Sequence, residues 1–510
     1  MQSLHPTALI VVAVAAALAS GGAHAADWMQ FGYDAAHSGF NSAETTLSMA
    51  NVAKLSTLYH VDLPSSIDSA PVYLSNVSTS SGTKNLLFAL SEGGRLMAID
   101  AATGTELWHA TMSGSGHTTT ASPAIDPGRK FVYAYGNDGK AHKFSVGDGA
   151  ETTSGGWPQT ITLKTNVEKG AGGFTIAHSH GVDWLYVVTD GYIGDGGDYQ
   201  GHLTTINLAS GAQSVFNTLC STQTTHFGNG DCDSRQSGIW GRGGATYDAR
   251  TDRVYLSTGN GQFNASTGGT NWGDSVLALG YDGTGAGGGM PRDSYTPSDF
   301  QHLQNSDIDL GSVGLAIVPP PSGSSIANVG VQAGKDGVLH VVNLDNMSGA
   351  GAPAHVGGEL QLIDVPQGAN GFPQDLMREQ PAVWKSGNTT WLFAGNGSGI
   401  SGLQLGLDGS TPSLSAIWTK TGGGNRSSSP VVANGVLFHA GTCGTSTCVN
   451  ARNPATGDVV WSSETIGSLH WNSPIVVDGK VFIIDRDGGL WAFGLADLPD
   501  EIYGNGFDPA

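Results

Sequence analysis

The sequence predicts an all-β protein, an eight-bladed β-propeller with four-stranded antiparallel blades. Three observations support this prediction. A motif with Thr-Gly at a turn and Trp four residues after the Gly occurs at Gly104 and Trp108 and again at Gly457 and Trp461. Asn-Gly and Asp-Gly pairs, which favour two-residue hairpins, separate runs of β-branched and aromatic residues. No segment shows the apolar period of about 3.6 residues over three turns that indicates a helix.

Counting pairs of apolar strands gives eight units, each with the four strands of a propeller blade. The units begin near residues 68, 121, 175, 238, 310, 380, 428 and 472. The eighth unit lacks an outer strand after Leu495, whereas Leu55–Val61 near the N-terminus is a spare strand. We expect the spare strand to close the ring, because closure removes unpaired sheet edges. Residues 26–510 are therefore predicted to form one propeller domain without a linker.

The N-terminal residues are typical of an export signal. Residues 9–18 form an uncharged apolar run, and Ala23-His24-Ala25 is an A-x-A cleavage site. The run is too short to span a bilayer, and no later stretch approaches the ~20 apolar residues of a membrane helix. We therefore expect a signal peptide over residues 1–25, a periplasmic or secreted protein and no membrane span.

Four cysteines fit an oxidising compartment. Their close spacings predict the disulfides Cys220–Cys232 and Cys443–Cys448, with four unpaired thiols as the alternative. Cys-x-x-Cys-His does not occur, so the sequence predicts no covalently attached c-type haem. The 43 acidic and 22 basic residues give a net charge of −21, which excludes a general nucleic-acid or anionic-membrane surface because such surfaces need clustered Lys and Arg.

Unusual residues gather where the predicted blades turn toward one face of the ring. The turns after the second strands contain residues 190–198, 258–264 and 333–337. The segments that lead into first strands contain His117, His178, His180, Trp240, residues 306–310, Arg378, Arg426, His470 and Trp471. Because these residues come from different blades, they can meet only around the central axis. Asp307 and Asp309 would repel each other there unless a cation or hydrogen bonds hold them.

Each of these residues also has a structural interpretation. Asn-Gly and Asp-Gly serve as turns because they tolerate positive φ. Trp240 could pack between blades, and the histidines lack the spacing of metal ligands, so they could be hydrogen-bonded structural groups. The functional interpretation depends on the coincidence of all these residues on one face, and on Lys335 in a turn that needs no lysine.

A likeness to a known family rests on a few segments. They are residues 27–41 and 51–55 near the N-terminus, and residues 239–248, 254–260 and 274–279 in the fourth unit. These segments resemble the pyrroloquinoline-quinone (PQQ) dehydrogenases, whose ring has eight blades, and most closely the subset containing polyvinyl-alcohol dehydrogenases. The likeness runs through nearly the whole chain after residue 26. Non-catalytic assembly lipoproteins share the repeat, so the individual positions carry more weight.

The resemblance implies roles for five residues. Trp240 stands where the family places a Trp under the planar quinone, and Asn260 where it places a metal-ligating Asn. Asp307 matches the proposed catalytic base, and Asp309 matches the second Asp of an Asp-x-Asp that serves lanthanide ions; both are also expected to be metal ligands. Lys335 matches the Arg or Lys that contacts the quinone oxygens. The implied cofactors are PQQ and Ca²⁺ or a lanthanide.

The sequence also departs from the family. The metal-binding Glu of the third blade has no evident counterpart, and Asp195 or Asp198 is the nearest carboxylate. The adjacent Cys pair beside the quinone is absent. No haem segment is present, so electrons would leave to a separate carrier.

Three functions stay open at this point. The first is PQQ-dependent oxidation of a small or polymeric alcohol or sugar hydroxyl. The second is a non-catalytic propeller scaffold or binding module with PQQ-like repeats. The third is a polysaccharide lyase or hydrolase that acts on an acidic glycan through a basic funnel of His117, His178, Arg378, Arg426 and His470.

Overall fold

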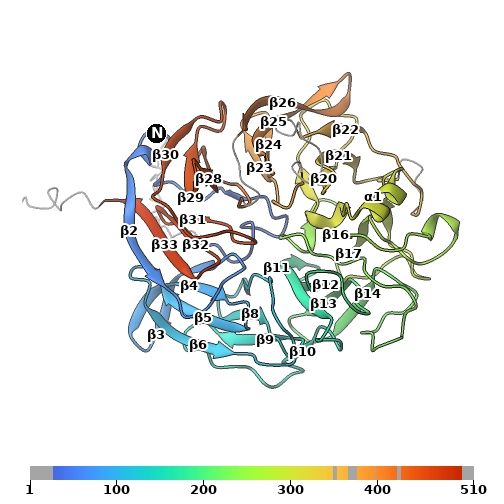
Figure 1. The fold of residues 1–510 in the computed structure, drawn as a ribbon, viewed down its shortest axis with the longest axis horizontal. Helices are drawn as coiled ribbons and strands as arrows, with labels where there is room; N and C mark the ends of the chain where they lie inside the picture. The colour runs from blue at the N-terminus through green and yellow to red at the C-terminus, as the bar shows by residue number, and fades with distance from the viewer. Residues whose placement is uncertain (1–26, 349–352, 366–375, 397, 422–426, 497–510) are drawn as a thin grey trace, which may run out of the picture.

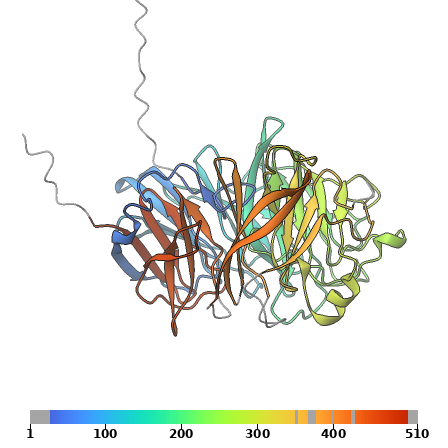
Figure 2. The same ribbon diagram turned by 90° about the horizontal axis from the view of Figure 1, so that it is seen from above.

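Eight twisted sheets surround a central axis (Figure 1). The computed structural model describes residues 27–348, 353–365, 376–396, 398–421 and 427–496, and every statement on the fold concerns these ranges. Turned by 90°, the ring is wider than it is tall (Figure 2). Each sheet is an antiparallel blade of four strands, and one blade carries a short fifth strand, so the predicted eight-bladed propeller is confirmed.

The blades follow the chain in order. The first four are β3 (Val72–Thr79), β4 (Gly82–Leu90), β5 (Arg95–Asp100) and β6 (Glu106–Thr111); β7 (Ala124–Ile125), β8 (Phe131–Tyr135), β9 (Lys140–Ser145) and β10 (Gln159–Thr160); β11 (Glu168–Ser179), β12 (Val182–Gly191), β13 (His202–Asn207) and β14 (Gln213–Asn217); β15 (Thr246–Asp248), β16 (Arg253–Ser257), β17 (Val276–Gly280) and β18 (Asp293–Tyr295).

The remaining four blades complete the circle. They are β19 (Ala316–Val318), β20 (Val329–Ala333), β21 (Val338–Asn343) and β22 (Gln361–Asp364); β23 (Ala382–Ser386), β24 (Thr389–Asn396), β25 (Gly399–Asp408) and β26 (Thr411–Thr421); β27 (Val431–Ala433), β28 (Val436–Cys443), β29 (Ser446–Arg452) and β30 (Val459–Ser462) with β1 (Phe40–Asn41); and β31 (Ile475–Val477), β32 (Lys480–Ile484), β33 (Gly489–Leu495) and β2 (Leu55–Asp62).

Helical structure in the described ranges is confined to short segments. They are α1 (Phe300–Ser306) and the 3-10 turns Val52–Lys54, Ala265–Thr267 and Leu310–Ser312. The sequence did not predict α1, because seven residues are too few to show a helical period over three turns.

The N-terminal strand closes the ring, as predicted. β2 pairs antiparallel with β33, from Leu55 opposite Leu495 to Asp62 opposite Gly489. In Figure 1 this blue strand lies beside the red strands of the last blade. A second contact of the N-terminal segment was not predicted: β1 pairs in parallel with β27, the first of the four antiparallel strands of the seventh blade. The N-terminal segment therefore holds two blades that are formed by the last third of the chain.

The repeated Trp residues join neighbouring blades. The Trp108 indole donates a hydrogen bond to the Val146 carbonyl at 3.1 Å, and the Trp461 indole donates to the Leu55 carbonyl at 2.8 Å. The Thr-Gly turn before Trp108 places Gly104 at φ +74°, with its Cα so close to Val61 that a Cβ would lie 2.7 Å from a Val61 methyl. The motif is therefore repeated because it sets the contact between one blade and the next.

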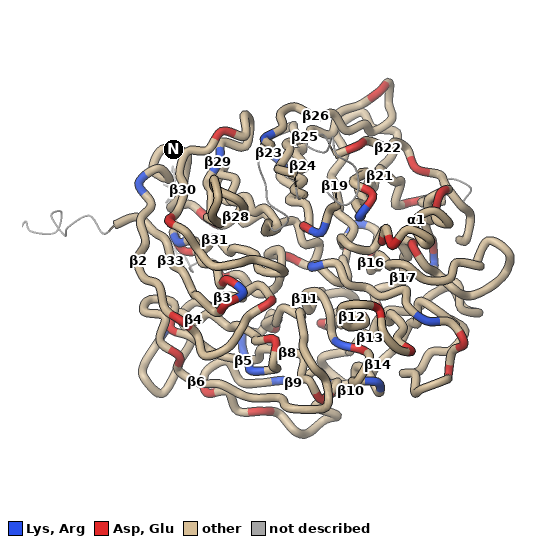
Figure 3. The backbone as a smooth tube through the Cα atoms, viewed as in Figure 1, with Lys and Arg blue, Asp and Glu red and all other residues tan. Residues whose placement is uncertain are grey.

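Both predicted disulfides, Cys220–Cys232 and Cys443–Cys448, are present. Lys and Arg form short, separated stretches in Figure 3 rather than one basic face. In the described part of the chain no helix is long and apolar enough to cross a membrane. The predicted signal peptide, residues 1–25, lies outside the described residues, and a periplasmic or secreted location stays a prediction.

Ring closure by β2 can be tested by truncation. Deletion of residues 27–62 removes β2 and leaves β33 with an unpaired edge, so we expect aggregation and loss of a single cooperative unfolding transition. The narrower variant Val61→Pro should lower the melting temperature, because proline cannot donate to the sheet. Circular dichroism and gel filtration would measure both effects. A soluble truncated chain that unfolds in one transition would contradict closure by β2.

Candidate functional site

A cavity of about 430 Å³ lies where segments from several blades meet on one face of the ring. Its size falls within the range of small-molecule sites, about 300–1,000 Å³. Turns that follow β12 and β20 contribute to its wall, together with the segments that precede β15, β19, β23 and β31. The lining includes Lys169, Asp190, Tyr192, Asp195, Trp240, Asp307, Asp309, Lys335, Arg378, His470 and Trp471. Most of the residues predicted to meet at the axis therefore do meet.

Two indoles form an aromatic surface in this cavity. The rings of Trp240 and Trp471 stack with centroids 5.8 Å apart and planes inclined by 29°. The Lys335 ammonium lies 5.3 Å from the centroid of the Trp240 ring, within the range of a cation–π interaction. Trp471 is held in place because its backbone N–H donates a hydrogen bond to the Asp68 carboxylate at 2.7 Å. Trp240 thus lines the cavity, rather than only packing between blades.

Lys335 joins the two predicted aspartates. Its ammonium lies 3.0 Å from the Asp307 carboxylate and also forms an ion pair with Asp309. Burial lowers the pKa of Lys335, but Asp309 and Asp307 together raise it above the usual value. The sequence required a cation or hydrogen bonds to hold this acidic pair. In the structure the ammonium of Lys335 is that cation.

The two aspartates differ in exposure. Asp307 follows α1 with φ +56°, and its side chain is 67 % exposed. The Asp309 side chain is 10 % exposed, and its carboxylate accepts the Asn260 backbone N–H at 2.6 Å. Asp309 therefore contacts mainly other residues of the protein, whereas the exposed Asp307 carboxylate can contact a molecule in the cavity.

Asn260 lies beside this cluster. Its side-chain amide is 3.3 Å from the Asp307 carboxylate and, in the alternate orientation of the amide, 3.2 Å from both Asp274 oxygens. Asp274 is buried and accepts the Leu310 backbone N–H at 3.1 Å. Burial, and then the charge of Asp309, raise the pKa of Asp274 well above its usual value. Asn260 therefore contacts Asp307 and, in the alternate amide orientation, Asp274, while its role as a metal ligand stays a prediction.

The third blade contributes carboxylates of two kinds. Asp195 lines the cavity and accepts a hydrogen bond from the Tyr199 hydroxyl at 2.7 Å. Asp198 is not part of the cavity lining; its carboxylate accepts hydrogen bonds from the Gln200 amide at 2.7 Å and the Gly230 backbone N–H at 3.1 Å. Of the two nearest carboxylates named from the sequence, only Asp195 is thus placed to meet a ligand.

Sequence reasoning missed Lys169, whereas Asp190 is the first residue of the predicted turn 190–198. Asp190 is the next-to-last residue of β12, and a Cβ at position 238 would collide with its carboxylate, so Gly238 is required there. Burial raises the pKa of Asp190 to about 7, Lys169 opposes this shift, and Asp309 and Asp195 add to it. Lys169 lies near the start of β11. Lys169 could have been found only by placing the start of β11 correctly.

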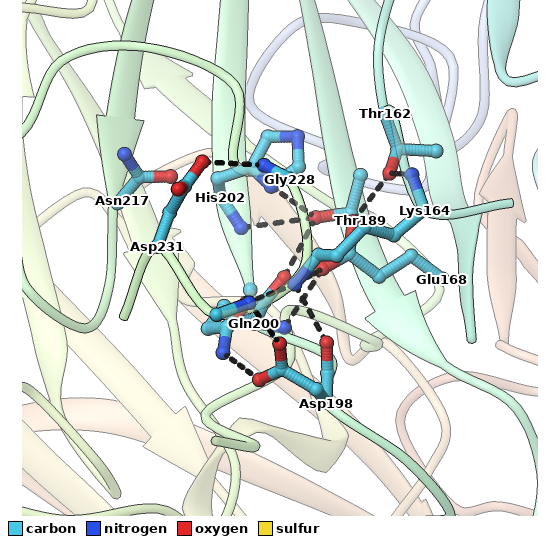
Figure 4. A network of polar contacts seen from close by, with 12 residues as sticks. Thr162, Lys164, Glu168, Thr189, Asp198, Gln200, His202, Asn217, Gly228 and Asp231 are labelled. Atoms are coloured by element: carbon cyan, nitrogen blue, oxygen red, sulfur yellow. Dashed lines mark hydrogen bonds and ion pairs between the residues drawn. The ribbon is translucent and has the colours of Figure 1, made fainter. Parts of the chain in front are cut away.

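A buried polar network holds this part of the wall (Figure 4). The Lys164 ammonium pairs with Glu168 at 2.9 Å, and both side chains are 1 % exposed. Lys164 also donates to the Asp198 carbonyl at 2.6 Å and to the Gln200 side chain. The Glu168 carboxylate accepts the Gln200 backbone N–H at 2.9 Å. The network therefore fixes the start of β11, next to Lys169, against the end of the turn after β12 that carries Asp195.

The basic residues predicted around the funnel separate into groups. Arg378 and His470 line the cavity, and His117 lies at its edge, where its backbone N–H donates to the Tyr192 hydroxyl at 3.0 Å. The expectation that His178 and His180 join them is wrong. β11 begins at Glu168 rather than near residue 175, so His178 lies at the far end of the strand, roughly 30 Å along it from Lys169. Arg426 lies outside the described residues.

His178 and His180 have partners of their own. His178 lies 2.7 Å from the Asp183 carboxylate, and His180 lies 2.9 Å from Asp252. His178 also lines a separate cavity of about 650 Å³. These contacts agree with the structural interpretation of the two histidines.

A metal ion does not fit the cluster in this arrangement. In the described ranges no three His, Cys, Asp or Glu side chains are grouped closely enough to hold one. The Lys335 ammonium occupies the position between Asp307 and Asp309 where a cation would bind. Metal ligation by Asn260, Asp307, Asp309, Asp195 or Asp198 stays a prediction.

Comparison with known proteins agrees with this geometry. Residues 28–286, just over half of the chain, match the model of the glucose/ethanol/alcohol dehydrogenase β-propeller domain. The chain belongs to this family. The predicted likeness to PQQ dehydrogenases is confirmed, whereas the polyvinyl-alcohol dehydrogenase subset stays a prediction. Residues 383–498 also match the model of the outer membrane protein assembly factor BamB. No curated protein matches the chain in sequence.

Solved structures of dehydrogenases share the fold of this family member. The quinohemoprotein alcohol dehydrogenase of Pseudomonas putida HK5 has 13 % identity and a TM-score of 0.63, over 92 % of this chain and 80 % of that one. The enzyme of Comamonas testosteroni has 16 % identity and a TM-score of 0.61 over the same shares. A europium-containing methanol dehydrogenase has 14 % identity and a TM-score of 0.61, over 92 % and 89 %. At these identities the likeness shows the fold.

The Lys164–Glu168 pair provides a stability test. Lys164→Met leaves the buried Glu168 carboxylate without its charge partner, and we expect it to lower the free energy of unfolding by about 3–5 kcal/mol. Lys164→Met combined with Glu168→Leu should recover part of that loss, because no buried charge is left. Lys420→Met, which breaks an exposed pair with Asp458, should have a far smaller effect. Urea unfolding measures all three, and equal losses for Lys164→Met and Lys420→Met would contradict this role.

Asp190 provides a test by pH. Its pKa is about 7 in the folded chain and close to 4 when unfolded, so the folded protein loses stability as pH rises through this window. Asp190→Asn removes this ionisation and should raise the free energy of unfolding by roughly 1–4 kcal/mol at pH 8.5. The gain should be much smaller at pH 5. Asp408→Asn, at an exposed position, is the control. A gain that does not depend on pH would contradict the shifted pKa.

Proposed function

We propose that the chain is a quinoprotein dehydrogenase that binds PQQ in the 430 Å³ cavity and oxidises an alcohol or sugar hydroxyl. One observation carries this proposal. The Trp240 indole, the Lys335 ammonium and the exposed Asp307 carboxylate are in contact within a single cavity at the centre of the ring. They come from three separate segments of the chain, so only a site on the axis brings them together.

The residues of the cavity fit PQQ by their chemistry. PQQ is a planar aromatic quinone with several carboxylate groups. The stacked Trp240 and Trp471 rings supply an aromatic surface for a planar molecule. Lys335, Lys169 and Arg378 supply positive charge in the same cavity for its oxygens. These five residues would hold the cofactor.

The protein residues then have distinct tasks. When bound, PQQ supplies the oxidising group that accepts the electrons of the alcohol. Asp307 accepts the proton of the substrate hydroxyl, because its carboxylate is exposed to the cavity. Asp309 holds the Lys335 ammonium beside Asp307, and this positive charge stabilises the oxygen from which the proton is removed. The electrons would leave to a separate carrier, which stays a prediction.

A non-catalytic scaffold is the second candidate. The match of residues 383–498 to an outer membrane assembly factor favours it, as does the lysine that already neutralises the two aspartates. The third possibility, a lyase or hydrolase acting on an acidic glycan, loses support. His178, one of its five basic residues, lies at the far end of β11.

The test separates cofactor binding from turnover. PQQ should quench the tryptophan fluorescence of the wild-type chain, and Trp240→Ala should weaken binding at least about tenfold because the aromatic surface is lost. Asp307→Asn should bind PQQ normally and lose more than about 99 % of dye-linked alcohol oxidation. Trp184→Phe, in the third blade outside the cavity, is the control for fluorescence. Titrations with and without Ca²⁺ would show whether a metal assists. A wild-type chain that does not bind PQQ under either condition would reject the dehydrogenase and favour the scaffold.

A further inference from the structure

A second cavity of about 510 Å³ adjoins the central one on the first blade. It is formed by the segment between β2 and β3, the turn between β4 and β5, and the segment between β6 and β7. The two cavities meet at an aromatic contact. His117 lines the second cavity, Tyr192 lines the first, and their rings lie 5.0 Å apart. The His117 and Tyr192 rings therefore stand between two neighbouring cavities.

We propose that this second cavity is a subsite for a neutral oligosaccharide, whose terminal unit enters the central cavity. The proposal rests on the proposed function in one respect, that the terminal sugar unit is the group to be oxidised. Binding of the oligosaccharide does not depend on that oxidation.

The second cavity is lined by hydroxyl groups that have no hydrogen-bond partner among the described residues. The side chains of Ser65, Ser66, Thr111 and Thr118 line it, and none of them takes part in a hydrogen bond among the described residues. Each hydroxyl can donate and accept, as the hydroxyl groups of a sugar do. A groove with several such groups side by side favours a ligand that carries many hydroxyls over an apolar one.

The charged groups of the second cavity are already paired, which favours a neutral ligand. Arg95 contacts both oxygens of Glu106 through one nitrogen, Nη2, at 2.8 and 3.0 Å. Glu92 accepts a hydrogen bond from Arg486 at 3.2 Å. An anionic chain would gain little from guanidinium groups that carboxylates neutralise. The described hydrogen bonds of Arg95 leave its Nη1 unused, and this nitrogen can donate to a neutral hydroxyl.

The aromatic contact between the cavities is rigid. The Tyr192 hydroxyl accepts the His117 backbone N–H at 3.0 Å and donates to the Thr165 carbonyl at 2.8 Å. His117 itself is exposed. Aromatic rings with a polar edge combine an apolar face with hydrogen bonding, which suits the C–H faces and hydroxyls of a sugar ring. This contact would support the chain where it passes between the cavities.

Calorimetry without PQQ tests the subsite. Maltose-series and cellulose-series oligosaccharides of one to four units would be titrated into the full chain. In at least one series we expect the trisaccharide to bind about tenfold more tightly than the monosaccharide. Ser66→Trp should abolish this gain and leave the affinity for the single sugar unchanged, because the indole fills the groove and Ser66 has no described side-chain contact to lose. Arg95→Met should reduce the gain by removing the Nη1 donor.

Controls keep the outcomes apart. Arg292→Met, at an exposed arginine between β17 and β18, should change nothing. Affinity that does not rise with chain length, a gain that survives Ser66→Trp, or tighter binding of galacturonate oligomers than of neutral chains would each overturn the subsite. If neutral chains bind with the expected gain but PQQ-loaded protein oxidises no alcohol, the proposed function fails and the subsite stands. If the PQQ-loaded protein oxidises small alcohols but its affinity for oligosaccharides does not rise with their length, the proposed function stands and the subsite fails.

Discussion

The pairing of β2 with β33 is the constraint on which the rest of the structure depends. Backbone hydrogen bonds between Leu55–Asp62 and Gly489–Leu495 turn eight separate sheets into a closed ring without free edges in the last blade. Only a closed ring brings the segment before β15, the turn after β20 and the segment before β31 to one axis. Trp240, Lys335 and Trp471 stand on those three segments. The cavity is thus a consequence of closure.

Close packing at the axis makes the aromatic surface rigid. Gly241 lies so near Val313 and Gly314 that a Cβ would be 2.7 Å from their backbone atoms. The next residue, Arg242, crosses the axis and donates hydrogen bonds to the Ser427 carbonyl at 2.8 Å and the His470 carbonyl at 2.7 Å. Its guanidinium carbon is 5.5 Å from the Trp471 ring. One arginine therefore links the segments that carry Trp240 and Trp471, and it leaves their rings little freedom to move apart.

Periodic features were predictable from the sequence, whereas features set by tertiary contacts were not. Pairs of apolar strands recur along the chain, so the blade count followed from them, and the missing outer strand of the eighth unit indicated the closing strand. β11 was misplaced because Gly170, Gly172 and Gly173 interrupt its pattern, and its register shifts between Ala171 and Thr175. That error put His178 at the wrong end of the strand. Lys335 was singled out, but its bond to both aspartates depends on α1, which ends where Asp307 adopts positive φ.

The contrast between Asp307 and Asp309 bears on whether the site is more than a structural ion pair. If the cluster only stabilised the fold, both carboxylates would be expected to be buried around the ammonium, as Lys164 and Glu168 are. Instead, Asp309 is buried and bonded to Asn260, and Asp307 is two-thirds exposed. The Asp307 carboxylate is therefore open to the cavity, as the proton acceptor of the proposed reaction has to be.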